Sequence, residues 1–393
     1  MKKMILVGMV VLLILAISCN GKASPQSGVS TSSGKNSDDG KVSATTALRA
    51  FQQTKKVDRE VVPDVEAIVK AMQGLSTSVI TELTQENASP LRNFSYDLTI
   101  DGKGVSIREY HNKTPVVIVP ETIEGIPVTE IQSGAFWLSD SIAIVLPETI
   151  TKIGVAGHST TPTIHSTFPS SIVIVNFPSA LIEIGPSSFA FTNLITAHLP
   201  EGLQILGEKA FTYCENLTTV TLPSSLKEIG REAFYYSQNL TSAHLPEGLN
   251  ELGSRAFLEC RSLSKLTLPS NLRVIPRESF RRTGIIELII PEGVEIIDAE
   301  AFCQCFRLLN VTLPSTIKEI RSSSFDSFGM GGAFMGCSNL TEIIIPDGVI
   351  SIAFIYAYSS YTDRPAIAVF KDCGKIKLTV RQRLKELGYT GVF

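Results

Sequence analysis

Residues 199–223 read LPEGLQILGEKAFTYCENLTTVTLP, and residues 245–269 repeat the pattern as LPEGLNELGSRAFLECRSLSKLTLP. In each stretch Ala-Phe follows the Leu-Pro pair after about eleven residues. The prolines recur every 22 or 23 residues, at Pro178, Pro200, Pro223, Pro246, Pro269, Pro291 and Pro314. A fixed period of this size predicts a solenoid, in which each repeat buries its apolar face only against its neighbours.

Each repeat divides into a strand, a return segment and a turn around the phenylalanine. Residues 217–222 read LTTVTL, which predicts a short strand with its leucines and valine inward and its threonines outward. Pro223 ends this strand, apolar residues point inward again on the return segment, and Gly230 allows the turn before Phe234. Each such phenylalanine is expected to fill the core, with neighbouring coils about 4.8 Å apart, the spacing of adjacent strands.

The pattern LPxxLxxIGxxAFxxCxxLxxVxLP resembles the BspA-type leucine-rich repeats of bacterial surface proteins, and residues 94–373 carry the resemblance. It implies an α/β fold, a right-handed solenoid with a concave parallel β-sheet, together with attachment to host or bacterial proteins. It implies no catalytic residues. We expect about ten coils of 22–23 residues over residues 120–373, a β-hairpin cap at 94–119 and a helical cap at 374–393. Local turn geometry is expected to change where other residues replace the glycine of the pattern, at Pro276, Asp298, Arg321 and Ala353.

The first 19 residues are expected to direct export. Lys2 and Lys3 precede an apolar run over residues 4–17 that is too short to span a bilayer comfortably. Residues 15–19, LAISC, are similar to a bacterial lipobox, in which Cys19 becomes the acylated N-terminus of the mature protein. Its acyl chains would hold the protein on a membrane surface. The alternative is an ordinary signal peptide whose cleavage removes Cys19.

Two segments separate this signal from the repeats. Residues 20–62 are rich in serine and glycine and predict a flexible tether. Residues 63–90 carry apolar side chains at three- and four-residue steps, which predicts an amphipathic helix packed on the open end of the solenoid or on another copy. Residues 94–119 alternate around Asp101-Gly102, a hairpin signal.

The charge and motif content favour binding of proteins over catalysis. The formal net charge is -3 and the basic residues are spread along the chain, so nucleic acid is not expected as a partner. No Ser-His-Asp pattern, phosphate-binding glycine loop or paired cysteine motif stands out, so no enzyme activity, metal or cofactor is expected. His198 and His244 share an outward slot two coils apart, roughly 10 Å, which is too far for a shared metal. A loop metal site at His158 and His165 is a minor alternative.

Five of the seven cysteines obey the repeat. Other coils place threonine or serine in the same slot, so the slot calls for a small, weakly polar side chain inside the turn, and free buried thiols are expected. For Cys305, Cys337 and Cys373, which lie in successive coils, a disulfide is the alternative. The five lie three residues past a core phenylalanine, at Cys214, Cys260, Cys305, Cys337 and Cys373.

Two surfaces are candidates for binding a partner. The first is the outward face of the predicted strands, with Thr196, His198, Thr219, Thr221, Ser242, His244, Lys265 and Thr267. The second is the edge from which three insertions project, near residues 154–166, 321–332 and 353–369, because insertions on one edge of a solenoid often form its binding face. The last insertion carries Tyr356, Tyr358 and Tyr361. The alternative for each surface is purely structural, since threonine and isoleucine suit any exposed strand and the loops could cap the terminal coils.

Together these features predict a lipid-anchored protein on the bacterial cell surface or outer membrane. Its expected partners are proteins, either of the host extracellular matrix or of other bacterial surfaces, and the membrane is contacted only through the lipid anchor. The alternative is a periplasmic structural or scaffolding lipoprotein without a host ligand. A hydrolase that uses the His158 loop is a distant third hypothesis.

Overall fold

The computed structural model describes residue 85 and residues 88–156, 166–323, 331–347, 349, 352–357 and 369–393. Cys19, the tether at 20–62, His158, His165, Tyr358 and Tyr361 lie outside the described residues, so the expectations for them remain predictions. The same holds for the helix at 63–90, of which only Gln85 and residues 88–90 are described; Gln85 is helical and residues 88–90 lie outside any helix.

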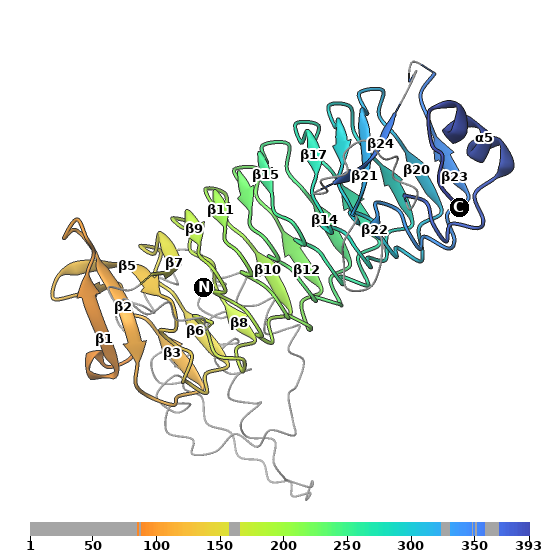
Figure 1. The fold of residues 1–393 in the computed structure, drawn as a ribbon. Helices are drawn as coiled ribbons and strands as arrows, with labels where there is room; N and C mark the ends of the chain where they lie inside the picture. Colours follow the sequence, from red (N-terminus) through yellow and green to blue (C-terminus); the bar gives the residue numbers. More distant parts are fainter. Residues whose placement is uncertain are drawn as a thin grey trace, which may run out of the picture.

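The described residues form a parallel β-solenoid of about nine turns, with helix α5 (Leu378–Glu386) near the C-terminus. Figure 1 shows the coils stacked side by side into an elongated body, with the strands of successive coils aligned. The predicted fold is confirmed. Every coil contributes to two rows of strands, and a turn around a buried phenylalanine, here called a plug turn, leads from the second row back to the first.

The first strand row holds the strands that precede the repeated prolines. Its strands pair in parallel with their neighbours in short hydrogen-bonded sheets. The row comprises β3 (Val116–Ile118), β6 (Ala143–Val145), β8 (Ile174–Val175), β10 (Thr196–His198), β12 (Thr219–Thr221), β14 (Ser242–His244), β16 (Lys265–Thr267), β18 (Glu287–Ile289), β20 (Asn310–Thr312) and β23 (Glu342–Ile344).

The second strand row lies on the return segments, which the sequence did not predict as strands. It forms a parallel run from β2 to β15 and a second run from β17 to β24. The row comprises β2 (Val105–Tyr110), β5 (Ile126–Gln132), β7 (Lys152–Val155), β9 (Glu183–Ile184), β11 (Ile205–Leu206), β13 (Glu228–Ile229), β15 (Glu251–Leu252), β17 (Val274–Ile275), β19 (Ile296–Ile297), β21 (Glu319–Ser323) and β24 (Ala353–Ala357). Two short strands, β4 (Thr122–Ile123) and β22 (Gly331–Gly332), pair antiparallel with β5 and β21.

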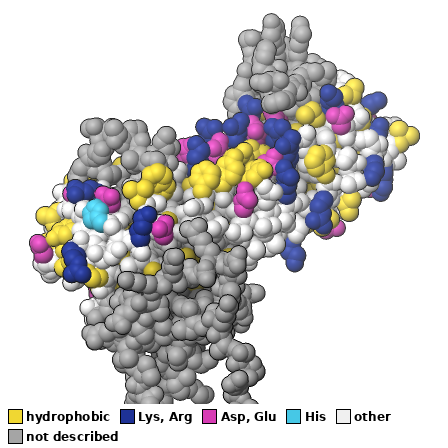
Figure 2. All heavy atoms as spheres, turned by 90° about the horizontal axis from the view of Figure 1, so that it is seen from below, with side chains coloured by type: hydrophobic (Ala, Val, Ile, Leu, Met, Phe, Trp, Pro, Cys, Tyr) yellow, Lys and Arg dark blue, Asp and Glu magenta, His cyan; other side chains and the backbone are white. Residues whose placement is uncertain are grey.

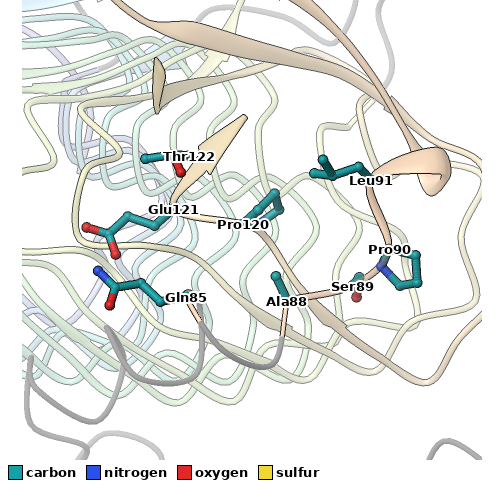
Figure 3. Close-up of a pocket in the computed structure, with 8 residues that line it drawn as sticks. All are labelled: Gln85, Ala88, Ser89, Pro90, Leu91, Pro120, Glu121 and Thr122. Atoms are coloured by element: carbon teal, nitrogen blue, oxygen red, sulfur yellow. The ribbon is translucent and has the colours of Figure 1, made fainter. Parts of the chain in front are cut away.

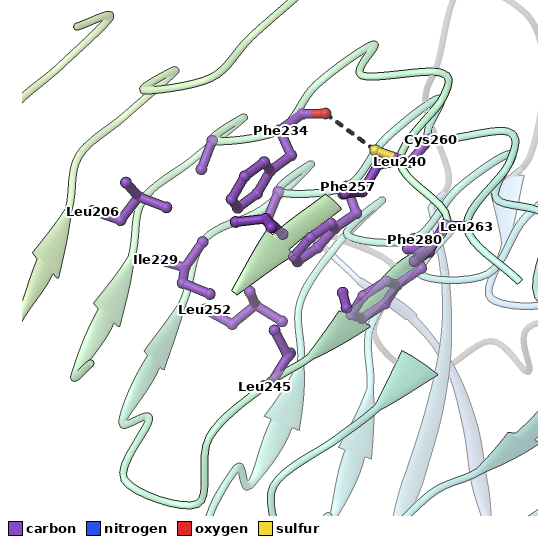
Figure 4. Packing of buried hydrophobic residues seen from close by; sticks show 14 of the residues in the cluster. Leu206, Ile229, Phe234, Leu240, Leu245, Leu252, Phe257, Cys260, Leu263 and Phe280 are labelled. Atoms are coloured by element: carbon purple, nitrogen blue, oxygen red, sulfur yellow. Dashed lines mark hydrogen bonds between the residues drawn. The ribbon is translucent and has the colours of Figure 1, made fainter. Parts of the chain in front are cut away.

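A column of phenylalanine rings runs through the core, as the repeat predicts. Adjacent rings lie 4.6 to 5.7 Å apart between centroids and within 12° of parallel. Figure 4 shows three of them packed among the leucines and isoleucines of the neighbouring coils. The column is fully buried and comprises Phe136, Phe168, Phe189, Phe211, Phe234, Phe257, Phe280, Phe302, Phe334 and Phe370.

The plug turns form a third ladder of backbone hydrogen bonds between coils. The amide of Phe211 donates to the carbonyl of Ala233, and that of Phe234 to Ala256, both at 2.7 Å. To point these groups along the solenoid axis, residues on either side of the phenylalanine adopt positive φ, as Glu232 at 57° and Tyr236 at 61° do around Phe234. The backbone groups of the turns are therefore paired between coils rather than hydrated.

The repeated glycine marks a place where coils approach closely. The amide of Gly253 donates to the carbonyl of Ile229 at 2.7 Å, and a Cβ on Gly253 would lie 2.3 Å from the backbone nitrogen of Arg231. In the next coil Pro276 takes this slot, and proline has no N–H to donate. The second strand row is interrupted at this point, between β15 and β17. The local change expected at Pro276 is therefore observed.

Both ends of the phenylalanine column are covered. At the N-terminal end a 3₁₀ turn (Leu91–Asn93) leads into β1 (Phe94–Leu98), which pairs antiparallel with β2 and packs Phe94 on Tyr110 at 5.0 Å. At the C-terminal end helix α5 (Leu378–Glu386) buries Val380 and Leu384, and Tyr389 meets the last ring, Phe370, edge-on at 5.2 Å. Within the described part of the chain, no helix has the length and apolarity of a membrane span.

Candidate functional site

The structure brings the predicted residues of the first strand row onto one face. Parallel pairing aligns Thr196 with Thr219 and His198 with Thr221, and the same register recurs between β14 and β16. In β10, β12 and β14 the middle residue is buried, the first is half-buried and the last is exposed. We call this surface the first-row face; it contains Thr196, His198, Thr219, Thr221, Ser242, His244, Lys265 and Thr267.

Polar contacts link neighbouring coils of the first-row face. His198 Nδ1 lies 2.9 Å from Thr221 Oγ1, and Thr218 Oγ1 donates to the carbonyl of Ile195 at 3.1 Å. Further along the row Ile289 is 72% exposed. The face therefore offers hydroxyl, imidazole and apolar groups at the spacing of the coils, and it carries few charges.

The histidines of this face show no metal-binding arrangement. Thr221 lies in the coil between those of His198 and His244, as the repeat predicts. Among the described residues, no three histidine, cysteine or acidic side chains form a group that could hold a metal ion. What the geometry offers is hydrogen bonding to a partner.

The turns after the prolines are held by pairs of glutamate and serine from adjacent coils. Glu247 Oε2 accepts hydrogen bonds from both the amide (2.9 Å) and the hydroxyl (2.8 Å) of Ser270, and Glu292 accepts the same pair from Ser315. These bonds stabilise the charged form and hold the pKa of both carboxyl groups below its usual value. The alternation of Glu-Gly and Ser along the sequence is therefore a repeated contact between coils.

The cysteine slot is a hydrogen-bond donor slot. The Cys260 thiol donates to the carbonyl of Phe234 at 3.1 Å (Figure 4), and Ser237 makes the same bond to Phe211 at 2.9 Å. Burial raises the pKa of the Cys214 thiol to about 12. The described cysteines are all buried and free, Cys305, Cys337 and Cys373 included, so the disulfide alternative is not observed in this structure.

The three insertions leave the solenoid from one edge. Each departs at or just after the end of a second-row strand and rejoins the chain just before a plug phenylalanine, with described ends at 156 and 166, 323 and 331, and 357 and 369. Tyr356 lies in β24. The loops themselves fall outside the described residues, so their role in binding remains a prediction.

The same edge carries an aromatic surface that the sequence did not predict. Phe191 stacks on Tyr213 with centroids 5.0 Å apart, and Tyr213 contacts Tyr235 and Tyr236 at 5.2 and 4.9 Å. Phe191 is 60% exposed. The signal that could have revealed it is the slot two residues past the plug phenylalanine, which is aromatic at 191, 213 and 236.

Arginine–glutamate ion pairs continue this edge over the next coils. Glu278 is paired with Arg255, Arg277 and Arg281, and its side chain is only 4% exposed. Glu259 is paired with Arg261 and Arg282. Burial raises the pKa of Glu259, but hydrogen bonds from Arg282 and Arg261 outweigh it and leave that pKa below its usual value.

A shallow pocket of about 480 Å³ lies at the N-terminal end of the solenoid. Figure 3 shows it between the segment that contains Ser89 and Leu91 and the turn that contains Glu121. Among the described residues that line it, Glu121 is the one acidic side chain and Gln85 supplies an amide.

The repeat geometry agrees with a known family. A family model described as "BspA type Leucine rich repeat region (6 copies)" matches residues 129–242, 164–285, 204–330 and 330–368, which is more than half of the chain. The chain belongs to this BspA-type leucine-rich-repeat family. Solenoids of the family are typically non-enzymatic binding scaffolds, and the family suggests interaction with proteins. No curated protein matches the chain.

Several solved bacterial leucine-rich-repeat structures are similar to this BspA-type chain. A T. pallidum leucine-rich-repeat protein is 21% identical, with 78% of this chain and 98% of that chain covered and a TM-score of 0.36. A Bacteroides ovatus leucine-rich-repeat protein is 23% identical over 72% of this chain and 86% of that chain, with a TM-score of 0.43. The pneumococcal vaccine antigen PcpA is 20% identical over 78% of this chain and 96% of that chain, with a TM-score of 0.40.

Proposed function

We propose that this protein is an exported lipoprotein, anchored through Cys19 at the bacterial cell surface, that binds proteins and mediates adhesion. Its partners are proteins of the host extracellular matrix or of other bacterial cells. The N-terminal charge, apolar run and LAISC sequence support the anchor, and membership in the BspA-type family supports protein binding.

The first-row face is the observation on which the binding role rests. Successive coils present an exposed side chain at the end of each three-residue strand, and the register of the strands keeps these side chains in rows. Within each group of paired strands, such as β10 with β12 and β14 with β16, the backbone is hydrogen-bonded between coils, so a ligand there meets side chains. Such a surface recognises an extended area of a folded partner and lacks the enclosure that catalysis needs.

Binding can be tested with the full-length protein purified in detergent and immobilised. It is probed with a panel of purified matrix proteins and with labelled bacterial outer surface proteins. Thr221→Arg and Thr267→Arg, which place bulky charges on exposed positions of the first-row face, are expected to abolish the captured interaction. Gln204→Arg, an exposed position on a return segment, is the matched control and should bind normally. If none of the probes binds, or if all variants bind alike, this role for the first-row face is wrong.

The competing proposal is a periplasmic scaffold lipoprotein without a host ligand. Protease added to intact cells separates the two, because a surface protein is degraded and a periplasmic protein is protected. Metabolic labelling with a radioactive fatty acid tests the anchor, which should be lost in Cys19→Ser. Protection of the protein in intact cells would refute adhesion while leaving the lipid anchor in place.

A further inference from the structure

The aromatic strip on the plug-turn edge consists of Phe191, Tyr213, Tyr235 and Tyr236. Three coils supply it, and the backbone ladder of the plug turns fixes their spacing, since the amide of Phe191 donates to Thr212 and that of Tyr213 to Tyr235. The rings of Phe191 and Tyr213 are within 9° of parallel, so they form one continuous apolar surface. The side chain of Phe191 is large and apolar, and yet 60% of the residue is exposed. The three tyrosines are half-buried, so the strip is a partly exposed aromatic surface with Phe191 at its open end, and exposed apolar surface of this kind can mark an interaction site.

The backbone geometry shows that the solenoid does not need aromatic residues here. Phe191, Tyr213 and Tyr236 have φ values of 62°, 54° and 61°, in the left-handed region that disfavours residues with a Cβ. In a later coil the same slot holds Gly336, with φ of 73°. Other coils adopt the same positive φ with Glu259 or Arg282 in this slot, so the turn does not require an aromatic residue.

An arginine-rich rim, here Arg231, Arg261 and Arg282 with the glutamates that they contact, adjoins the strip. Tyr236 bonds through its amide to the carbonyl of Leu258, which places it beside the coil of Glu259 and Arg261. The glutamates of the rim are nearly buried beneath their arginines, with 8% of the Glu259 side chain and 4% of the Glu278 side chain exposed.

The arginines of the rim remain open to solvent: the side chains of Arg231, Arg261 and Arg282 are 51%, 57% and 40% exposed. Figure 2 shows hydrophobic side chains gathered along the middle of one face of the solenoid, bordered by Lys, Arg, Asp and Glu side chains. The rim therefore presents guanidinium groups outward while its carboxylates are already occupied.

We propose that the aromatic strip and its arginine rim dock an acidic protein segment that presents carboxylates beside apolar side chains. This inference rests on the proposed protein-binding function and assigns it a second surface and a partner chemistry. Apolar side chains of the partner pack on the rings, and its carboxylates pair with the N–H groups of Arg231, Arg261 and Arg282 that do not already donate to Glu232 or Glu259. Tyrosine and arginine are the residue types that dominate binding energy at protein interfaces. A polyanion without apolar groups would use the arginines alone and leave the aromatic strip without a partner.

The probe is a fluorescein-labelled peptide of alternating glutamate and leucine or phenylalanine residues, measured by fluorescence anisotropy with the full-length protein. A peptide with lysine in place of glutamate and a polyglutamate of equal length are the controls. The acidic apolar peptide is expected to bind at least about tenfold more tightly than either control, because each supplies only half of the complementary chemistry. Its affinity should fall as salt is added, because the rim contacts are ionic and exposed.

Two variants test the residues. Phe191→Gly is expected to weaken binding about tenfold while its melting temperature stays near that of the parent, because relief of the positive φ offsets the lost ring contact. Arg261→Ser should weaken binding and flatten the salt dependence. Phe306→Ser removes a ring that is 52% exposed two coils beyond Arg261 and outside the strip, and Arg273→Ser removes a guanidinium that is 73% exposed outside the rim; both should bind normally.

Three outcomes would overturn the proposal. The first is that polyglutamate binds as tightly as the acidic apolar peptide. The second is that the control variants lose as much affinity as Phe191→Gly and Arg261→Ser, and the third is that the acidic apolar peptide does not bind. The first would point to a polyanion site. The first-row variants Thr221→Arg and Thr267→Arg are measured with the same peptide and should leave its binding unchanged. A failure of the first-row face in adhesion is thereby distinguished from a failure of the aromatic strip.

Discussion

Replacing Gly253 by alanine is expected to lower the free energy of unfolding by about 2 kcal/mol, through overpacking that strains a hydrogen bond between coils. The new methyl carbon would lie 2.3 Å from the nitrogen of Arg231 and 2.4 Å from the carbonyl carbon of Gly230. Both are backbone atoms of the preceding coil, so no side chain can move aside, and the coils must separate. The amide of Gly253, 2.7 Å from the carbonyl of Ile229, then loses part of its hydrogen bond.

The magnitude follows from three contributions. Overpacking costs about 1–3 kcal/mol, a weakened backbone hydrogen bond costs about 1 kcal/mol, and the stiffer unfolded chain returns about 0.4–1 kcal/mol. Gly374→Ala is the matched control: a Cβ there meets nothing within 4 Å and its φ is not positive, so no loss is expected.

Urea unfolding followed by circular dichroism gives the midpoint of each variant. Solenoids can unfold in segments because each coil contacts only its neighbours. Hydrogen exchange of peptides that cover residues 227–257 therefore supplies a local measurement, and exchange in Gly253→Ala should accelerate there first. A Gly253→Ala protein as stable as the parent, with unchanged exchange in these peptides, would refute the close-approach explanation of the glycine slot.

Three further predictions follow from the contacts between coils. Cys260→Ser is expected to leave the melting temperature nearly unchanged, because Ser237 already makes the equivalent bond, whereas Cys260→Ala should lose about 1 kcal/mol; equal losses in thermal melts would contradict the donor role. The lowered pKa of Glu247 means that its stabilisation is present above its unfolded value near 4.3 and is lost as pH falls through the lower folded value. Glu247→Gln should therefore lose less melting temperature between pH 6 and pH 3 than the parent protein does. If the variant and the parent lose the same amount, the contact between Glu247 and Ser270 does not contribute to the loss of stability at low pH. Tyr389→Ala removes a fully buried ring from the C-terminal cap and should cost about 3–5 kcal/mol, with exchange accelerated in residues 369–393 before the central coils; uniform acceleration would argue against a local capping role.

The phenylalanine column and the cysteine slot could be predicted from the sequence because both repeat with the period of the coil. Phe211 and Phe234 lie 23 residues apart in the sequence and 5.5 Å apart between ring centroids. A slot shared by Cys260, Ser237 and Thr192 limits the side chain to a small donor, and that is how the structure uses it, with Thr192 Oγ1 donating to the carbonyl of Phe189. When every coil has the same length, a residue type that recurs with the period of the coil predicts the same position in each coil.

The second strand row could not be predicted in the same way. Strands such as β13 have two residues, which is too short for a period-two alternation to appear in the sequence. They are strands only because the neighbouring coil supplies hydrogen-bond partners in register, as Glu228 pairs with Glu251 and Ile229 with Leu252. The pairing depends on stacking of the coils and is not encoded within a single repeat.

The aromatic strip escaped prediction for a different reason. Three of its members, Phe191, Tyr213 and Tyr236, occupy a turn slot that holds Glu259, Arg282 and Gly336 in other coils, so no common residue type marks the slot as a site. Only the structure shows that Phe191 and Tyr213 stack there and remain partly exposed. Sequence periodicity identifies what all coils share, whereas a binding surface depends on what distinguishes a few of them.

This separation explains how one solenoid can present two independent surfaces. The coils are held by three backbone ladders and by the buried phenylalanines. The residues at the ends of the first-row strands and two residues past the plug contribute their backbone to these ladders, but the ladders do not use their side chains. An outward residue such as Thr221, or a turn residue such as Tyr236, can therefore change with little effect on the fold. Substitutions on the first-row face and on the aromatic strip lie on different edges of the coil and share no contact, so their effects on binding should be additive. A strongly non-additive effect of Thr221→Arg and Phe191→Gly on one ligand would mean that a single partner spans both surfaces.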